Sequence, residues 1–191
     1  MYCYYGGLDL LLNNLTIVIP VKEDPRIVEE FIKGNMKLLI GNHIIVVNRS
    51  GGEALKPFST KWLDRISTLW GAREEGLSHV GTDFVLNLDA NKILPEGYIE
   101  QAMKLFDQDS EHNIAVIAID HEDLMGHLSF GTSIWRTNAL KVLYNWTQST
   151  SRFCECTYMW SRVRKAGFRI ETLNMRAIHL KKRKDKGEQE I

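Results

Sequence analysis

Residues 71–98, GAREEGLSHVGTDFVLNLDANKILPEGY, decide the fold expected for this chain. The apolar run 84–88 predicts a buried strand, which delivers Asp89-Ala90-Asn91 to a turn at its carboxyl end. In open α/β sheets, ligands bind at that edge of the sheet. Two oxygen-bearing side chains separated by one residue can both face a hard divalent cation. The stretch therefore predicts a metal-binding turn at the end of a buried strand.

Strand and helix patterns alternate on both sides of this stretch. Strands are expected at 15–21, 44–47, 65–69, 114–119 and 168–173, and helices from Asp24-Pro25 onward and at 72–79, 96–108, 137–146 and 158–165. Residues 126–135, which contain glycines and aromatic residues, are expected to form a loop. Because the strands are nearly all apolar, this order predicts an α/β fold with a mainly parallel central sheet flanked by helices on both faces.

Composition narrows the class of protein. At 191 residues, 44% hydrophobic and 25% charged, the chain can bury an ordinary core, and one domain or at most two are expected. The formal net charge is zero, so no overall field attracts nucleic acid. The apolar stretches are too short or too interrupted to span a bilayer, and the amino terminus lacks a secretory pattern. We therefore expect a cytoplasmic protein that binds no nucleic acid and has no transmembrane segment.

Two smaller features agree with this expectation. The three cysteines, Cys3, Cys154 and Cys156, cannot all pair and lack zinc-ribbon spacing, so reduced thiols are expected. The basic run 181–184 is followed at once by acidic residues, so residues 181–191 are expected to form a charged, disordered tail. A weak contact of this tail with a phosphate-bearing lipid or a membrane surface is the alternative.

Five segments carry a resemblance to a known family. They are LTIVIPVKEDP (15–25), IIVVNRSGG (44–52), residues 71–101, SFGTSIWRTNAL (129–140) and CECTYMWSRVRKAGF (154–168). Taken in this order, they resemble glycosyltransferases of the GT-A fold and the family 2 type, over about residues 15–179. The resemblance implies a Rossmann-like, nucleotide-diphospho-sugar transferase domain over 1–180, with a nucleotide-binding half at about 15–120 and an acceptor-side half at about 121–180.

The resemblance implies transfer of a sugar from a UDP- or GDP-sugar donor, a hexosyltransferase-like activity of class EC 2.4. The acceptor would be a glycan, a protein, a lipid or a small molecule. Mn²⁺ or Mg²⁺ would bind at the D-x-D element, with Asp89, Asn91 and His179 as its ligands. The residues implied for binding the donor nucleotide and its phosphates are Pro20, Val21, Lys22, Asn48, Arg73 and Asp89.

The acceptor side is implied by the last two segments. Phe130, Gly131 and Trp135 would line the sugar or acceptor pocket, and core packing is the default explanation of the two aromatic rings. Glu155 is the best available catalytic base, and the alternative for it is a helix-start carboxylate stabilised by the helix dipole. For Arg73, the alternative is a solvated arginine paired with a neighbouring glutamate.

Three positions depart from the pattern of the family, and each replaces an acid. Asn48 stands where a uridine-contacting aspartate is usual, and Asn91 stands at the last acid of the D-x-D element. Cys156 occupies the place of the aspartate that is the general base in inverting members, and a thiol of ordinary pKa is a poor base at neutral pH. Inverting transfer is favoured over retaining transfer, which would need no such base.

The lost acids leave a second function open. A non-catalytic nucleotide- or sugar-binding protein on a degenerate GT-A scaffold would also tolerate them. A nucleotidyltransferase is a weaker alternative, because residues 20–26, after the first strand, contain no glycine of a phosphate-binding loop.

Overall fold

The computed structural model describes residues 14–49, 52–65, 68–121, 128–144 and 155–180. The predicted tail 181–191, Cys3 and Cys154 lie outside the described residues. In chain order the elements are β1 (Leu15–Val21), α2 (Pro25–Gly34), α3 (Met36–Leu39), β2 (His43–Asn48), the 3-10 helix η1 (Lys56–Phe58), β3 (Lys61–Asp64), α4 (Leu69–Ser78), β4 (Phe84–Leu88), β5 (Lys92–Ile93), α5 (Tyr98–Gln108), β6 (Ile114–His121), β7 (Thr132–Arg136), α6 (Thr137–Leu143), α7 (Glu155–Lys165) and β8 (Arg169–His179).

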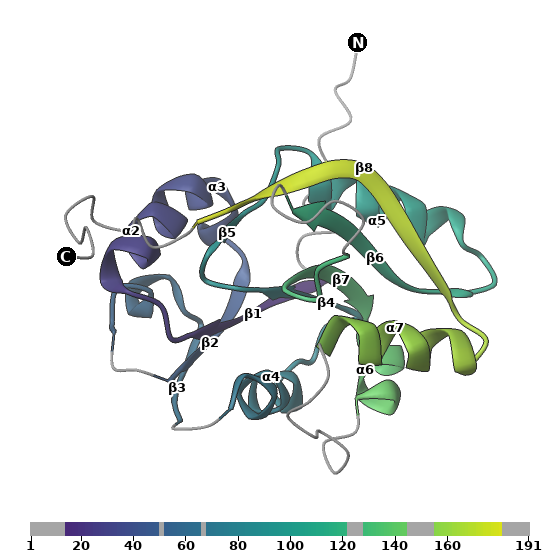
Figure 1. The fold of residues 1–191 in the computed structure, drawn as a ribbon, viewed down its shortest axis with the longest axis horizontal. Helices are drawn as coiled ribbons and strands as arrows, with labels where there is room; N and C mark the ends of the chain where they lie inside the picture. The colour runs from purple at the N-terminus through teal and green to yellow at the C-terminus, as the bar shows by residue number, and fades with distance from the viewer. Residues whose placement is uncertain (1–13, 50–51, 66–67, 122–127, 145–154, 181–191) are drawn as a thin grey trace, which may run out of the picture.

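The described strands form one curled sheet in the order β3-β2-β1-β4-β7-β6-β8-β5 (Figure 1). The pairs β1–β2, β1–β4, β2–β3 and β6–β8 are parallel, whereas β4–β7, β6–β7 and β5–β8 are antiparallel. The expected α/β class is confirmed, and the expectation of a mainly parallel sheet holds for only part of the sheet. The amino-terminal half is parallel, and the antiparallel pairs come from strands β5 and β7.

Strand β7 corrects the second part of the loop expected at 126–135, whereas the described residues 128–131 belong to no helix or strand. Its residues Thr132 to Arg136 pair with β4 on one side and β6 on the other, so they lie in the middle of the sheet. The sequence TSIWR is short and follows Gly131, and the glycine signal outweighed the strand propensity of its threonine, isoleucine and tryptophan. An antiparallel strand therefore joins the two halves of the chain.

The strand expected at 65–69 was also wrong at its described residues, whereas 66–67 lie outside them. The third strand lies earlier, at β3, and Leu69 already begins helix α4. Helix α4 begins here because its first turn is capped. The Thr68 hydroxyl accepts a hydrogen bond from the backbone N–H of Gly71 at 3.1 Å, which satisfies one of the free donors of that turn. The predicted helix at 72–79 is confirmed, with its start three residues earlier.

Helices cover both faces of the sheet, as expected. Helices α2, α3 and α5 lie on one face, and α4, α6 and α7 lie on the other (Figure 1). Successive side chains of a strand point to opposite faces of the sheet, so the core is divided into two clusters, one on each face. In β4, Leu86 packs in the cluster that contains Phe31 of α2, whereas Val85 packs in the cluster that contains Ala72 of α4. The strands are apolar in succession because both of their faces are buried.

Helix α4 approaches strand β1 unusually closely. A Cβ atom on Gly76 would overlap Cγ1 of Val18, so only a glycine allows this distance. Arg73 lies three residues before Gly76 and therefore on the same face of the helix. The close packing brings the guanidinium of Arg73 against the sheet, where it is 3% exposed.

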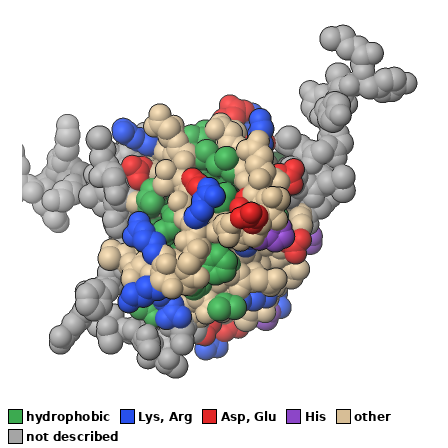
Figure 2. Space-filling view, turned by 90° about the vertical axis from the view of Figure 1, so that its right-hand side faces the viewer, with side chains coloured by type: hydrophobic (Ala, Val, Ile, Leu, Met, Phe, Trp, Pro, Cys, Tyr) green, Lys and Arg blue, Asp and Glu red, His purple; other side chains and the backbone are tan. Residues whose placement is uncertain are grey.

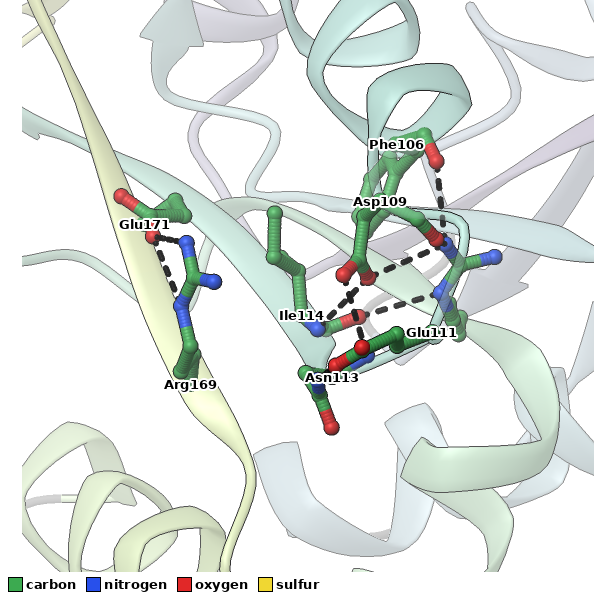
Figure 3. A network of polar contacts seen from close by, with 8 residues as sticks. Phe106, Asp109, Glu111, Asn113, Ile114, Arg169 and Glu171 are labelled. Atoms are coloured by element: carbon green, nitrogen blue, oxygen red, sulfur yellow. Dashed lines mark hydrogen bonds and ion pairs between the residues drawn. The ribbon is translucent and has the colours of Figure 1, made fainter.

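The turn between α5 and β6 is held by the carboxylate of Asp109. It accepts hydrogen bonds from the backbone N–H groups of Ile114 at 2.7 Å and Asn113 at 3.1 Å, and Figure 3 shows it pointing at them. Arg136 of β7 adds an ion pair at 3.3 Å and lies over the ring of Phe106. Burial raises the pKa of Asp109, but these donors outweigh it and the net shift is downward.

We expect the substitution Asp109→Asn to lower the free energy of unfolding by about 1–3 kcal/mol at pH 7, because a charge-assisted contact is lost from a side chain that is only 6% exposed. The pKa of Asp109 is lower in the folded chain than in the unfolded chain. Its stabilisation is therefore complete above about pH 4, the unfolded value, and is lost as the pH falls through the folded value. Urea unfolding of both proteins from pH 7 to pH 3 should show the difference shrinking; a constant difference would contradict this.

Candidate functional site

The carboxyl ends of β2, β1 and β4 lie side by side, as the parallel register requires. Val21 stands opposite Asn48 in the β1–β2 ladder, and Asp89 follows directly after β4. The structure thereby places Pro20, Val21 and Asn48 at the same sheet edge as the Asp89 turn. Pro20 and Val21 are buried, and Lys22, the next residue, is exposed. This is the edge at which the sequence predicts donor binding.

The centre of the site is Arg73, whose guanidinium bridges two carboxylates. It forms ion pairs with Asp89 at the end of β4 and with Glu155 at the start of α7. The side chain of Glu155 is 8% exposed and that of Asp89 is 24% exposed. Arg73 therefore joins one helix, one strand end and a second helix that is distant in the sequence. The alternative of a solvated arginine is excluded by its burial.

Two aromatic residues complete the surroundings of this bridge. The hydroxyl of Tyr144 donates a hydrogen bond to Oε1 of Glu155 at 2.7 Å. Burial raises the pKa of Tyr144, so the phenol keeps the proton that it donates. The guanidinium of Arg73 lies 4.9 Å from the centre of the Phe130 ring, which is the geometry of a cation–π contact. The charges are thus held in a largely apolar environment.

The carboxylate of Asp89 lies directly against Gly131. The backbone N–H of Asp89 donates to the carbonyl of Gly131 at 3.0 Å, and a Cβ atom at position 131 would overlap the carboxylate. Gly131 precedes strand β7, so the antiparallel pairing of β7 with β4 brings it to this point. The structure therefore brings together the predicted residues Asp89, Arg73, Glu155, Phe130 and Gly131.

The turn also offers a second oxygen for a divalent cation. Among the described residues, the amide oxygen of Asn91 is buried without a hydrogen-bond partner, while its amide nitrogen lies 3.5 Å from Oε1 of Glu23. An unpaired buried oxygen beside a carboxylate is the chemistry that Mg²⁺ and Mn²⁺ prefer. Mg²⁺ is typically held by one or two protein oxygens together with substrate phosphates. Asp89 and Asn91 supply oxygen donors of the type that such an ion binds.

The third predicted ligand, His179, lies at the end of β8. It pairs with Lys92 in the β5–β8 ladder, and the backbone N–H of Leu180 donates to the carbonyl of Asn91 at 2.8 Å, so this strand end adjoins the turn. In the described part of the chain, no group of three or more His, Cys, Asp or Glu side chains could hold a metal.

Sequence reasoning missed three polar residues of this edge: Arg49, Glu23 and Tyr144. Arg49 follows β2, and its backbone N–H donates to the carbonyl of Val21 at 2.8 Å. Burial and the nearby guanidinium of Arg73 lower the pKa of Arg49, and Glu23 opposes this shift. The two guanidinium groups are therefore close enough for each charge to be felt at the other. Asn48, the neighbour of Arg49, donates to Asp64 of β3 at 2.9 Å.

The aromatic residues expected to stack on a sugar lie inside the core instead. Trp135 is fully buried and stacks with Trp160 of α7 at a centroid distance of 5.6 Å, and its indole N–H donates to Ser133. Phe130 is 1% exposed. Packing explains both side chains, because both rings lie in one core cluster and contact Trp160 of α7. Neither ring presents a face to a ligand in this structure.

Cys156, in place of the expected base, has a structural contact. Its sulfur accepts a hydrogen bond from the backbone N–H of Phe130 at 3.3 Å, and the thiol is free of disulfide bonding. The carboxylate of Glu155 is engaged on both oxygens, by Arg73 and by Tyr144. The described residues of α7 therefore offer the site an anchored carboxylate and a thiol.

The surface gives little sign of a single charged patch on the face seen in Figure 2, where basic and acidic side chains are interspersed and apolar ones form separate areas. A search of the described residues found no helix with both the length and the apolar character needed to cross a bilayer.

The fold is similar to that of solved glycosyltransferases. One is the mannosyltransferase PcManGT from Pyrobaculum calidifontis, solved in complex with GDP-Man and Mn²⁺, at a TM-score of 0.69 and 12% identity over 90% of this chain and 58% of that chain. Another is TarS 1–349 of S. aureus, at a TM-score of 0.62 and 16% identity over 87% of this chain and 60% of that chain. The chain thus spans about three fifths of each of these proteins.

At these identities the likeness shows the fold, and it supports the glycosyltransferase resemblance at that level. No protein-family model matches the sequence, and no curated protein matches it significantly.

The contact between Gly131 and Asp89 gives a test of the site's geometry. We expect Gly131→Ala to lower the free energy of unfolding by about 1–3 kcal/mol, because the added methyl group must displace a carboxylate in a packed region. Gly81→Ala is the matched control, since no atom lies within 4 Å of the Cβ that it adds. Its effect should stay within about 0.5 kcal/mol of zero. Equal effects of the two substitutions in chemical denaturation would show that Asp89 is not confined as described.

Proposed function

We propose that the protein is a glycosyltransferase that transfers a sugar from a nucleotide-diphosphate donor to an acceptor hydroxyl or other nucleophile. The observation that carries the proposal is the cluster Asp89–Arg73–Glu155 at the carboxyl edge of the sheet. This edge is the ligand-binding position of open α/β sheets, and the fold is shared with a mannosyltransferase solved with its GDP-sugar and Mn²⁺. A UDP- or GDP-sugar is the proposed donor.

The donor nucleotide is proposed to lie over the ends of β1 and β2. Pro20, Val21 and Asn48 would contact the nucleoside, and Lys22 would face the phosphates. Arg73 and Arg49 would bind the diphosphate, because planar guanidinium groups suit phosphate oxygens and the charge of Arg73 is felt at Arg49. In this proposal the two guanidinium groups would pair with the negative charge of the donor phosphates.

A bound Mn²⁺ or Mg²⁺ ion would neutralise the charge that develops on the leaving diphosphate. Asp89 and Asn91 are the proposed protein ligands, with His179 as a third. Glu23, in contact with Asn91, would hold the amide so that its oxygen faces the ion. Asp89 and Asn91 would supply two oxygen ligands of the ion, and the substrate would supply further ones.

Transfer forms a bond between the acceptor atom and the anomeric carbon while the bond from that carbon to the diphosphate breaks. The proposed acceptor region is the segment before β7, around Gly131, beside Asp89. In an inverting course the acceptor proton passes to a base, and Glu155 is the base that the resemblance implies. The inverting course is proposed ahead of the retaining one.

A non-catalytic binding protein is the second candidate, and the contacts of α7 favour it specifically. Glu155 is fully engaged, and Cys156 replaces the usual acid. Such a protein would bind a nucleotide sugar without turnover. Replacing Asn91 and Cys156 by aspartate would separate the two cases: a gain of transfer from nothing favours the binding protein, and a loss of existing transfer favours the adapted enzyme.

Asp89 gives the main test of the proposed donor site. We expect GDP-mannose or one of the common UDP-sugars, added with Mn²⁺ at about 100 times its dissociation constant, to stabilise the native chain by about 2.7 kcal/mol. In Asp89→Asn this stabilisation should be lost. Asp83→Asn is the matched control at the opposite end of β4, where the carboxylate is exposed and bonded to Asn14. A thermal-shift titration of all three proteins measures this, and a native chain indifferent to every nucleotide sugar would overturn the proposal.

Arg49 gives a second test. Arg49→Gln should weaken binding of the same nucleotide sugar about tenfold, which corresponds to the loss of one charge-assisted phosphate contact. Arg26→Gln removes the same charge from an exposed side chain of α2 that is 78% accessible, and it should change the affinity by less than about twofold. Isothermal titration calorimetry compares the two. Equal affinities in both variants would remove Arg49 from the donor site.

A further inference from the structure

Arg73 is one cation shared between two carboxylates. Asp89 and Glu155 approach the same guanidinium from different elements, and the guanidinium is 3% exposed. A buried arginine must keep counter-charges, because an unpaired buried charge is strongly destabilising. How Arg73 divides its donors between the two acids therefore determines how much negative charge remains available on Asp89.

Glu155 is poorly placed for the role of a base. A general base must reach the proton that it removes within about 2.6–3.2 Å, or through one water molecule. Here one oxygen of Glu155 is paired with Arg73, the other accepts the Tyr144 hydroxyl at 2.7 Å, and the side chain is 8% exposed. These contacts fix the orientation of Glu155 and direct its charge at the arginine.

We propose that Glu155 is a positioning residue that holds one terminal nitrogen of Arg73, so that only the other pairs with Asp89 and Asp89 stays able to bind a divalent cation. The inference rests on the proposed donor and metal site, and it replaces the role of base that the resemblance implies for Glu155. Tyr144 locks Glu155 in place, and the ring of Phe130 supports the guanidinium from one face. Helix α7 thus acts on the metal turn through Arg73, without touching the substrate.

The physical argument is a competition for one carboxylate. A cation and a guanidinium both seek the oxygens of Asp89, and the guanidinium has five N–H donors in a fixed plane to distribute. While Glu155 takes some of these donors, Asp89 retains charge for the ion. Without the charge of Glu155, Asp89 is the remaining ionic partner that the described contacts give to Arg73, and the competition turns against the ion.

The test uses Mn²⁺ alone as the probe, with free Mn²⁺ followed by electron paramagnetic resonance. Native protein is compared with Asp89→Asn, which identifies the site, and with Glu155→Gln. We expect Glu155→Gln to weaken Mn²⁺ binding about tenfold, the equivalent of one charge-assisted hydrogen bond. Glu96→Gln removes one exposed negative charge, from a side chain that is 89% accessible, and should leave the affinity within about twofold.

A double-mutant cycle shows whether the effect passes through Arg73. In an Arg73→Gln background, Glu155→Gln should change Mn²⁺ affinity by less than about twofold, and Arg73→Gln alone should tighten binding because the competitor is gone. If thermal unfolding shows that Arg73→Gln does not fold, Arg73→Lys replaces it, since a lysine cannot bridge both acids as a planar fork does. A tenfold effect that persists in that background would mean a direct charge effect, and it would overturn the proposal.

Two further outcomes would overturn the positioning role of Glu155. If Glu155→Gln leaves Mn²⁺ affinity unchanged while transfer from the nucleotide sugar falls a hundredfold or more, Glu155 is the base and the positioning role is overturned. The proposed transferase then still stands. If the native chain has no Mn²⁺ site that Asp89→Asn removes, the cation part of the proposed function fails, and this inference fails with it.

Discussion

The pairing of the Arg73 guanidinium with two carboxylates is the interaction on which the site depends. It ties helix α4 to the end of β4 through Asp89 and to helix α7 through Glu155. Because all three side chains are largely withdrawn from water, their interaction is less screened than a surface ion pair would be. The close packing of Gly76 on Val18 sets the depth at which the arginine lies. A glycine one turn away thus controls where the positive charge of the site is located.

The chain's second constraint is the antiparallel strand in the middle of an otherwise mostly parallel sheet. Since β7 runs against β4, its beginning meets the end of β4, and Gly131 comes to lie on Asp89. A parallel strand at this position would have begun at the opposite edge of the sheet. The donor half and the acceptor half of the proposed enzyme therefore meet at one turn.

Local patterns predicted most of the framework and only part of the site. The apolar run 84–88 and the turn at Asp89 could be read directly, because a buried strand and its end are local features. Strand β7 could not, since Gly131 signals a loop locally and its reason for being glycine is a carboxylate far away in the sequence. Arg49 and Tyr144 carried no motif, and their roles arise from tertiary neighbours. The sequence allows Trp135 either to contact a ligand or to pack in the core, and its burial favours packing.

The groups around Asp89 are far apart in the sequence. This separation affects the stage of folding at which the site forms. Strands β1, β2 and β4 bring together segments from the first half of the chain, whereas Gly131 and Glu155 arrive from the second half. Contacts between distant segments require large loops to close and form slowly. Until the second half of the chain arrives, Arg73 lacks both Glu155 as its second counter-charge and the ring of Phe130. We therefore expect the site to be completed late in folding, when the two halves of the chain come together.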